Sequence, residues 1–396
     1  MKRLGARSAA VFAGLCLGST ALAAPDGVSP ETRDRLRALG YAETVGTTDP
    51  YDGRSGVTIH DSGRAAQGVN VYCSEARDEV FFVDMDGNTL RTLPLPHRGL
   101  PGNECLPVLY GERDLLVLNA PALMRLGADG AVRWLRVGQF HHDVAVGPKG
   151  EIYAWESRAK SLVHRDQEIE IANHVLSVLT PDGDPTREID LYDLFGDRIP
   201  ETRLTLIARR TRRVEKVGRD LLQKTMDVFH PNSVEYVESP PSGMEDADLL
   251  ISIRNLDLIA LVDSERKAVV WSWGKGILER QHQPTLLQNG NILVFDNGMW
   301  RRWSRVIEVD PRREEIVWEY RAPDFFSAGR SGAELLPGGN RLITESGRGR
   351  VFEITGDGDV VWEFLNPIFD GSSGERTTVY RMLRISPRRW RAFAKD

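Results

Sequence analysis

The chain has 396 residues, of which 41% are hydrophobic and 27% charged, and this balance excludes a disordered or a fibrous protein. The formal net charge is −6, and removing Lys2, Arg3 and Arg7 with a leader of 23 residues takes it to −9. An acidic chain lacks the basic surface that binds phosphates, so we expect no nucleic-acid partner.

The first 23 residues have the three parts of a secretory signal peptide. Basic residues open the chain, an apolar stretch covers residues 8–20, and Ala21-Leu22-Ala23 supplies a small-x-small cleavage site. The apolar stretch is shorter than a membrane span requires, and no later segment is apolar enough to cross a bilayer. The sequence therefore predicts an exported protein, periplasmic or secreted, with no membrane span in the mature chain.

Residues 24–68 are expected to form an N-terminal segment that contains one short helix. Ser29 is a capping residue, Pro30 suits a first helical turn, and Gly40 is a typical helix end. Beyond this segment the mature chain keeps two cysteines, Cys73 and Cys105. They are compatible with one disulfide in an oxidising compartment, or with two buried thiols.

The C-terminal half contains a repeat of four short segments rich in β-branched and aromatic residues. The corresponding pairs of segments are 282–290 and 331–339, 291–298 and 340–347, 305–310 and 350–355, and 316–319 and 360–363. Glycine-containing turns separate the segments, as expected for antiparallel strands. Units of four strands and roughly 40 residues are typical of the blades of a β-propeller.

The same pattern can be followed towards the N-terminus. It gives blades over residues 230–273, 142–191 and 103–137, and a blade short of one strand over residues 69–95. The alternating run 377–385 is otherwise unassigned, and we expect it to supply the missing innermost strand, which would remove an open sheet edge. The sequence thus predicts an all-β fold: a six-bladed β-propeller over residues 69–387, followed by a C-terminal tail, 388–396.

One insertion, at about 192–228, interrupts the pattern between blades three and four. Residues 200–227 lack turn signals and carry apolar residues near helical spacing, so an amphipathic helix is predicted. Its arginines could guide anions or form a lid, or they could simply be a solvated basic face. They are Arg209, Arg210, Arg212 and Arg213.

Three consecutive blades begin with a histidine. His142 lies eight residues before Gly150, His282 lies eight before Gly290, and His230 opens the blade between them. Because the innermost strands of a propeller line its central channel, equivalent positions in adjacent blades should converge near the axis. Arg254, at the end of a neighbouring strand, is expected to point into the same channel mouth.

The remaining histidines have no place in this pattern. They lie between the predicted strands and are expected on the surface: His60, His97, His164 and His174. His141 duplicates its neighbour in sequence, so either His141 or His142 can be the one that faces the channel.

Several short motifs resemble those of the bacterial arylsulfate sulfotransferases. They are His142-Asp143-Val144, His230-Pro231-Asn232-Ser233, Ser252-Ile253-Arg254, Gln281-His282, and 295–298 followed by Ser304-Arg305-Val306. The similarity covers most of residues 69–367 with the motifs in the same order. The family is a six-bladed propeller, generally exported, that moves a sulfuryl group from a phenyl sulfate to a phenol without a nucleotide donor.

Carried onto this sequence, the resemblance implies that His282 is the nucleophile and forms a transient sulfohistidine. His142, His230 and Arg254 would hold the sulfuryl oxygens, and Asn232 is a further candidate for the same pocket. The implied partners are an aryl sulfate donor and a phenolic acceptor, with neither a metal nor another cofactor. A homodimer is compatible with the sequence.

The chemistry is also reasonable from the residues alone. Neutral imidazole is a nucleophile near neutral pH, a nearby protonated histidine can assist departure of a phenolate, and arginine stabilises charge on peripheral oxygens. Two alternatives remain at this point. Three histidines could bind a catalytic metal, with Asp143 or Asp296 as a further ligand, or the propeller could be a non-catalytic module that binds a ligand or a protein partner.

Overall fold

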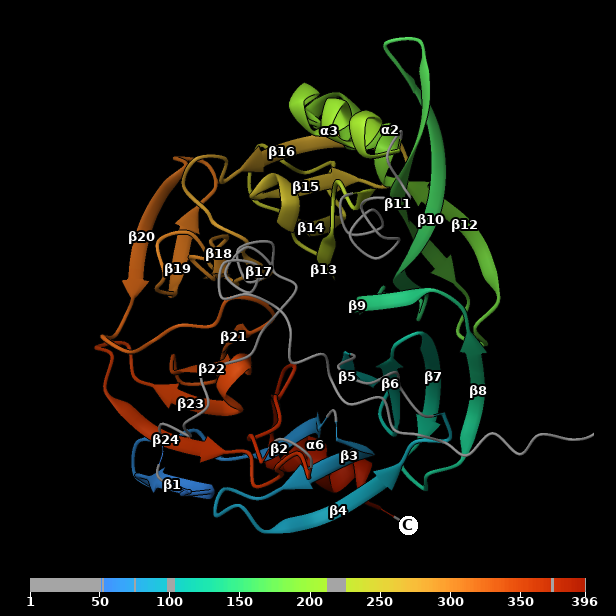
Figure 1. The fold of residues 1–396 in the computed structure, drawn as a ribbon. Helices are drawn as coiled ribbons and strands as arrows, with labels where there is room; N and C mark the ends of the chain where they lie inside the picture. Colours follow the sequence, from blue (N-terminus) through green and yellow to red (C-terminus); the bar gives the residue numbers. More distant parts are fainter. Residues whose placement is uncertain are drawn as a thin grey trace, which may run out of the picture. The chain divides into compact units, whose positions relative to one another are not determined.

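The computed structural model describes residues 51–395 except 52, 75, 98–103, 212–225 and 372–373. Within this part of the chain, six antiparallel sheets stand in a ring, which confirms the predicted six-bladed β-propeller (Figure 1). The expected signal peptide and the helix after Ser29 lie outside the described residues. None of the helices in the described part is both long and apolar enough to cross a bilayer.

Each blade is built outwards from a strand at the channel. Blades one to three consist, from inside to outside, of β25 (Leu383–Ile385), β2 (Val69–Ser74), β3 (Arg77–Val83) and β4 (Thr89–Pro94); β5 (Cys105–Tyr110), β6 (Asp114–Asn119), β7 (Ala122–Gly127) and β8 (Val132–Val137); and β9 (Phe140–Val146), β10 (Ile152–His164), β11 (Gln167–Leu179) and β12 (Pro185–Asp190).

The remaining blades follow the same order. They consist of β13 (Pro231–Tyr236), β14 (Leu249–Ile253), β15 (Leu258–Asp263) and β16 (Ala268–Trp273); β17 (His282–Leu286), β18 (Ile292–Asp296), β19 (Arg305–Asp310) and β20 (Glu315–Tyr320); and β21 (Gly332–Leu335), β22 (Arg341–Glu345), β23 (Arg350–Ile354), β24 (Val360–Leu365) and β1 (Gly56–His60).

Burial follows position within a blade. Every residue of β18 is buried, whereas β20 at the outside of the same blade alternates between exposed and half-buried residues. The second and third strands are covered on both faces because neighbouring blades pack face to face. Leu250 and Leu261 of blade four, for example, share one apolar cluster with Val294 and Ile307 of blade five.

The ring closes through the C-terminal strand, as the sequence predicts. β25 pairs with β2, and Leu383 lies opposite Val71. A second closure was not predicted: β1 adds a fifth strand to the outside of blade six, where Val57 lies opposite Phe364. The disulfide left open by the sequence is present between Cys73 and Cys105, and it joins β2 of blade one to β5 of blade two.

The expected C-terminal tail is instead largely a helix, α6 (Pro387–Phe393), capped by Ser386. Phe393 stacks on Phe82 at a ring-centroid distance of 5.1 Å and is fully buried. One buried aromatic, which the sequence of this short segment does not reveal, anchors the helix to blade one.

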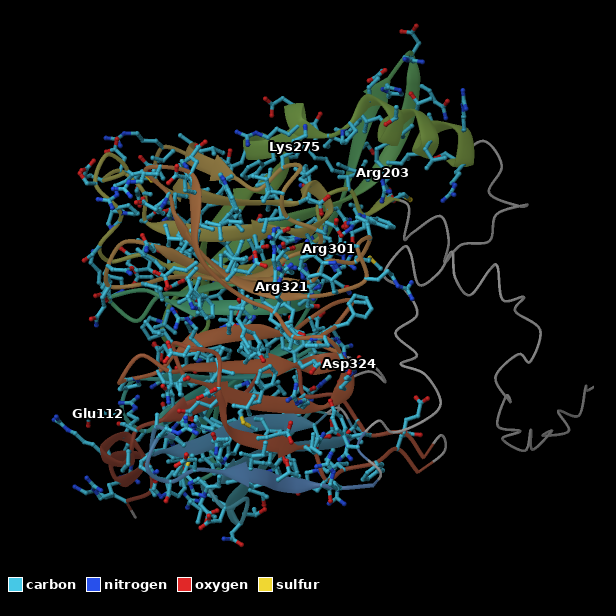
Figure 2. All side chains as sticks on the ribbon, turned by 90° about the vertical axis from the view of Figure 1, so that its left-hand side faces the viewer. Glu112, Arg203, Lys275, Arg301, Arg321 and Asp324 are labelled. Carbon is cyan, nitrogen blue, oxygen red and sulfur yellow. A yellow bond between two sulfur atoms is a disulfide. The ribbon has the colours of Figure 1, made fainter. Side chains whose placement is uncertain are left out.

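The insertion between blades three and four contains α2 (Leu191–Phe195), a 3₁₀ turn (Gly196–Arg198) and α3 (Glu201–Thr211). Arg209 and Arg210 lie in α3, while Arg212 and Arg213 lie outside the described residues. α3 packs on an unusually long hairpin made by β10 and β11, which extends beyond the ring (Figure 1). In the side view, Arg203 of α3 and Arg301 lie towards one face of the ring, and Glu112 lies at the other (Figure 2).

Candidate active site

Irregular backbone at the start of the innermost strands shapes the candidate site. His142 and His230 have φ values of 62° and 52°, which are uncommon for residues other than glycine. The pairing of β9 with β10 is irregular at this point, because His141 lies opposite Trp155 while Val144 lies opposite Ala154. Such bulges turn a side chain out of the sheet plane, and here they turn the two imidazoles towards each other.

The structure brings His142 and His230 into direct contact. Their Nε2 atoms are 3.0 Å apart, and the rings meet edge to face. Glu104, just before β5, accepts a hydrogen bond from the backbone N–H of His142 at 2.6 Å and lies 3.1 Å from its Nε2. The Tyr380 hydroxyl donates to the carbonyl oxygen of His142 at 2.8 Å. Blades one, two and four therefore fix this one histidine of blade three.

His230 is held by the carboxylate of Asp227, three residues earlier. One carboxylate oxygen accepts from the backbone N–H of His230 at 2.9 Å, and the other accepts from its Nδ1. A hydrogen bond from the backbone N–H of Arg254 to the carbonyl oxygen of His230 attaches the segment to the turn after β14. His230 therefore presents Nε2 to the site.

His141 and His174 extend this cluster. His141 Nδ1 lies 2.7 Å from His142 Nδ1, and His141 Nε2 lies 3.0 Å from His174 Nδ1. His174 Nε2 lies 3.1 Å from Asp227 Oδ1. His142 therefore contacts His230, and His141 connects His142 to His174 in β11 of blade three.

The prediction that His164 and His174 lie on the surface was wrong. His174 is in β11 and only 4% exposed, and His164 is in β10 and 8% exposed. The cause is the long β10–β11 hairpin, since the segment predicted to be a loop is two paired strands covered by α3. His164 contacts Thr205 of that helix and takes no part in the cluster.

His282, the first residue of β17, is fixed by hydrogen bonds on both ring nitrogens. Nδ1 lies 2.7 Å from the side-chain oxygen of Asn297 and 3.0 Å from the carbonyl oxygen of Arg280. Since both partners are acceptors, Nδ1 carries the proton. Nε2 accepts a hydrogen bond from the backbone N–H of Arg330 at 3.0 Å. The neutral imidazole is thus held in the tautomer whose lone pair is on Nε2.

Arg254 supplies a buried cation to the same site. Its Nη1 lies 3.4 Å from the side-chain oxygen of Asn255, which also accepts from Arg280. Burial lowers the pKa of both His230 and His282, and the positive charge of Arg254 adds to the effect on each.

Asn232 is placed differently from the other predicted residues. Its side chain is 0% exposed, and its Nδ2 donates to the carbonyl oxygen of Gln281 at 2.8 Å. Gln281 precedes His282, so Asn232 supports the backbone of the proposed nucleophile. Its side-chain oxygen has no hydrogen-bond partner among the described residues.

Burial sets the protonation of the cluster. It is the main cause that lowers the pKa of His141, His142, His230 and His282, and neighbouring imidazoles and Arg254 act in the same direction. The Asp227 carboxylate acts in the opposite direction on His141, His142 and His230. The pKa of Asp227 is lowered well below its usual value, because interactions with His230 and His174 outweigh burial, which alone would raise it. Burial therefore disfavours charge on each single imidazole, whereas the Asp227 carboxylate is held in its ionised form.

Sequence reasoning missed three groups that contact the channel histidines: Asp227, Glu104 and Tyr380. Each lies just before a strand, outside the repeat-equivalent positions on which the prediction rested. The spacing Asp227-x-x-His230 is a local signal that could have identified one of them. Glu104 and Tyr380 arrive from other blades and have no such signal.

The described residues contain no group of three or more His, Cys, Asp or Glu side chains arranged to hold a metal ion. The nitrogens of His142 and His230 point at each other rather than at a shared empty point. Asp296 is engaged by Arg301 and Arg305 instead of facing the histidines.

Known proteins resemble this chain in fold or in sequence. A search of solved structures returns a crystal structure of a protein of unknown function from Bacteroides caccae, with 11% identity and a TM-score of 0.50 over 80% of this chain and 98% of that one. It also returns a virginiamycin B lyase from Staphylococcus aureus, with 13% identity and a TM-score of 0.45 over 78% of this chain and 83% of that one. Identities this low bear on the fold alone.

The sequence comparisons are more specific. No curated protein gives a significant match. The family model described as Arylsulfotransferase (ASST) matches residues 139–367, which is more than half of the chain and includes His142, His230, Arg254 and His282. The chain belongs to the arylsulfotransferase family.

Proposed function

We propose that this protein transfers a sulfuryl group from an aryl sulfate to a phenol through a sulfohistidine at His282, without a nucleotide donor. Family membership supports the overall reaction. One observation supports the covalent step: the buried, neutral His282 has its Nδ1 proton held by acceptors and its lone pair on Nε2. An imidazole in this state is a nucleophile that needs no separate base.

In the first half-reaction, Nε2 of His282 attacks the sulfur atom and the bond from sulfur to the aryl oxygen breaks. The hydrogen bond from the backbone N–H of Arg330 now occupies the Nε2 lone pair, so the incoming sulfur replaces it. As the imidazole becomes positive, the Nδ1 proton is stabilised by the oxygens of Asn297 and Arg280. In the second half-reaction a phenol oxygen takes the sulfuryl group and restores neutral His282.

His142, His230 and Arg254 surround the oxygens of the sulfate ester. Sulfuryl transfer, like phosphoryl transfer, places negative charge on peripheral oxygens in the transition state, and fixed donors and cations stabilise that charge. Arg254 suits this role because its charge is permanent and its donors form a fork. Asn232 acts one step away, through the backbone beside His282.

The protein acts outside the cytoplasm in this proposal. The disulfide between Cys73 and Cys105 supports export, because such bonds persist in oxidising compartments. The N-terminal leader supplies the route.

The experiment that tests the function measures release of a chromogenic phenol from its sulfate ester, with and without a second phenol as acceptor. Transfer predicts that the sulfated acceptor appears in the same amount as the released chromophore. Release that is independent of acceptor and yields only inorganic sulfate would contradict it. His282→Ala should abolish both products.

A further inference from the structure

Four imidazoles and one carboxylate form a closed ring of hydrogen bonds beside the proposed sulfuryl pocket. We call this set the histidine ring; its members are His141, His142, His174, His230 and Asp227. Going around it, consecutive members are joined at 2.7 Å (His141 to His142), 3.0 Å (His142 to His230), by the short contact of His230 with Asp227, at 3.1 Å (Asp227 to His174) and at 3.0 Å (His174 to His141).

The ring requires one proton more than neutral side chains would supply. Each of its five contacts joins two atoms that would repel as bare lone pairs, so each contact needs one proton. Four neutral imidazoles carry four protons and an ionised carboxylate carries none. The closed ring therefore holds one further proton, and its net charge is zero.

The surrounding acceptors place this further proton. Contacts with carboxylate oxygens put protons on Nε2 of His174, on Nδ1 of His230 and, through Glu104, on Nε2 of His142. With their protons on Nε2, neutral His174 and His142 have an unprotonated Nδ1, and both of these Nδ1 atoms face His141. They are therefore acceptors unless one of them takes the further proton. His141 lies between them, so the further proton belongs to the run His174–His141–His142.

We propose that the histidine ring lends this proton to the departing phenolate and recovers it from the acceptor phenol, with His141, His174 and Asp227 as positioning residues. The inference rests on the proposed sulfuryl transfer and assigns a role to three residues that do not contact the substrate. In this proposal the histidine ring, which lies in blades three and four, holds the proton that sulfuryl transfer requires.

The protons balance over the two half-reactions. When the sulfur–oxygen bond breaks, the Nε2 proton of His142 passes to the aryl oxygen, and the proton between His141 and His142 moves onto His142 Nδ1. The donor leaves as a neutral phenol, and the ring is left with four protons. The acceptor phenol then gives its proton back to the ring as its oxygen forms the bond to sulfur and the bond from sulfur to His282 breaks. No proton is exchanged with solvent overall.

Burial opposes the further proton, and the charged groups around the ring act on it in both directions. Arg254 and His282 face it from blades four and five, and Arg203 of α3 donates to the backbone oxygen of Asp227. Glu104 faces it from blade two, and Tyr380 contacts the backbone of His142. The two carboxylates, Asp227 and Glu104, attract a proton, whereas Arg254 and the neighbouring imidazoles repel it.

Asp227→Asn tests the idea cleanly. An asparagine amide can accept one hydrogen bond and donate another, so four neutral imidazoles suffice to close the ring and the further proton is lost. His164→Gln is the matched control, because His164 is a buried histidine of the same hairpin that contacts Thr205 and lies outside the ring. Thermal unfolding of both variants checks that each is folded.

The decisive readout is the dependence of kcat/KM on the leaving group. A donor whose phenol is acidic enough to leave as the phenolate, such as 4-nitrophenyl sulfate, needs no proton, whereas phenyl sulfate, with a leaving-group pKa of about 10, does. We expect Asp227→Asn to lose about 100-fold with phenyl sulfate and less than about 3-fold with 4-nitrophenyl sulfate. His164→Gln should change neither.

Equal losses with both donors, or no loss with either, would overturn the inference, since a merely structural role does not distinguish leaving groups. Imidazole ¹⁵N NMR provides a readout that is independent of activity. The wild type should show one imidazolium in the ring near neutral pH, and Asp227→Asn none. If the wild type transfers no sulfuryl group at all, the proposed function fails, while the NMR spectra still decide whether the proton is there.

Discussion

Nε2 of His142 lies 3.0 Å from Nε2 of His230, although 88 residues separate them in the chain. The contact exists because blades three and four are neighbours in the ring and each has a histidine in the left-handed region, His142 within β9 and His230 just before β13. The contact holds Nε2 of His142 against His230, and the proposed chemistry depends on this convergence of neighbouring blades.

Replacing Arg254 should strongly slow sulfuryl transfer. Arg254→Gln removes a buried permanent charge that balances the transition state, so we expect kcat to fall by about 100-fold or more. Arg254→Lys should recover only part of this, because a point charge replaces a fork of donors. The control is Arg266→Gln, since Arg266 is exposed and paired with Asp263 in the turn after β15; kcat for Arg266→Gln should match the wild type.

Activity should persist into acid. Burial and Arg254 hold the pKa of His282 well below 6.5, so the nucleophile remains neutral as the pH falls through 6.5. We therefore expect kcat/KM for 4-nitrophenyl sulfate, a donor that needs no proton, to stay level through this range and to decline only at lower pH. A decline centred at pH 6.5 would show that His282 titrates as an exposed histidine.

The same shift makes the fold sensitive to acid. The unfolded chain binds a proton on His282 near pH 6.5, whereas the folded protein does not until a lower pH, so stability falls as the pH falls below 6.5. His282→Asn should remove part of this dependence. The comparison is the Tm of the wild type and the variant at pH 7.5 and pH 5.5, and parallel falls would contradict the assignment.

Glu235 should act in the opposite sense. Burial on β13 raises the pKa of its carboxyl group to about 8, so the folded protein retains a proton that the unfolded chain loses near pH 4.5. Its contribution to stability is fully present below pH 4.5 and is lost as the pH rises from there through about 8. Glu235→Gln should raise the Tm at pH 9 by about 2–5 °C and change it little at pH 5. If the Tm difference between Glu235→Gln and the wild type is the same at pH 9 and pH 5, the result would contradict this prediction.

Removing the disulfide should lower stability without altering the site. Cys73→Ser with Cys105→Ser frees a link between blades one and two that closes a loop of 32 residues. The expected loss is about 2–4 kcal/mol in the free energy of unfolding, with kcat unchanged at low temperature. Denaturant unfolding with and without reductant measures it, and reductant should have no effect on the double variant.

The repeat made the propeller predictable, because turn glycines and β-branched strands recur at fixed spacing and each blade is a local unit. It also identified His142, His230 and His282, which occupy the start of their blades. The closure by β1 was not predictable in this way, since a lone strand that pairs Val57 with Phe364 leaves no periodic signal.

His174 shows the second limit of the sequence. It is brought to His141 by the extension of β10 and β11 beyond the blade, and such a departure from a repeat can be recognised only when the pairing is seen. Asp227 was missed for a related reason: it lies after an insertion whose path back to the channel the sequence does not specify. Residues that reach the cluster through an insertion or an extended hairpin were therefore harder to predict than residues at repeat positions.

The most direct test of the account is the mass of the protein after brief reaction with an aryl sulfate in the absence of acceptor. We predict one added sulfuryl group, located on the peptide that contains His282, which disappears when a phenol is added and is absent from His282→Ala. His164→Gln, which should carry the group as the wild type does, controls for a general effect of losing a histidine. Turnover by a protein that never carries the group, or a group found on another residue, would contradict the proposed mechanism.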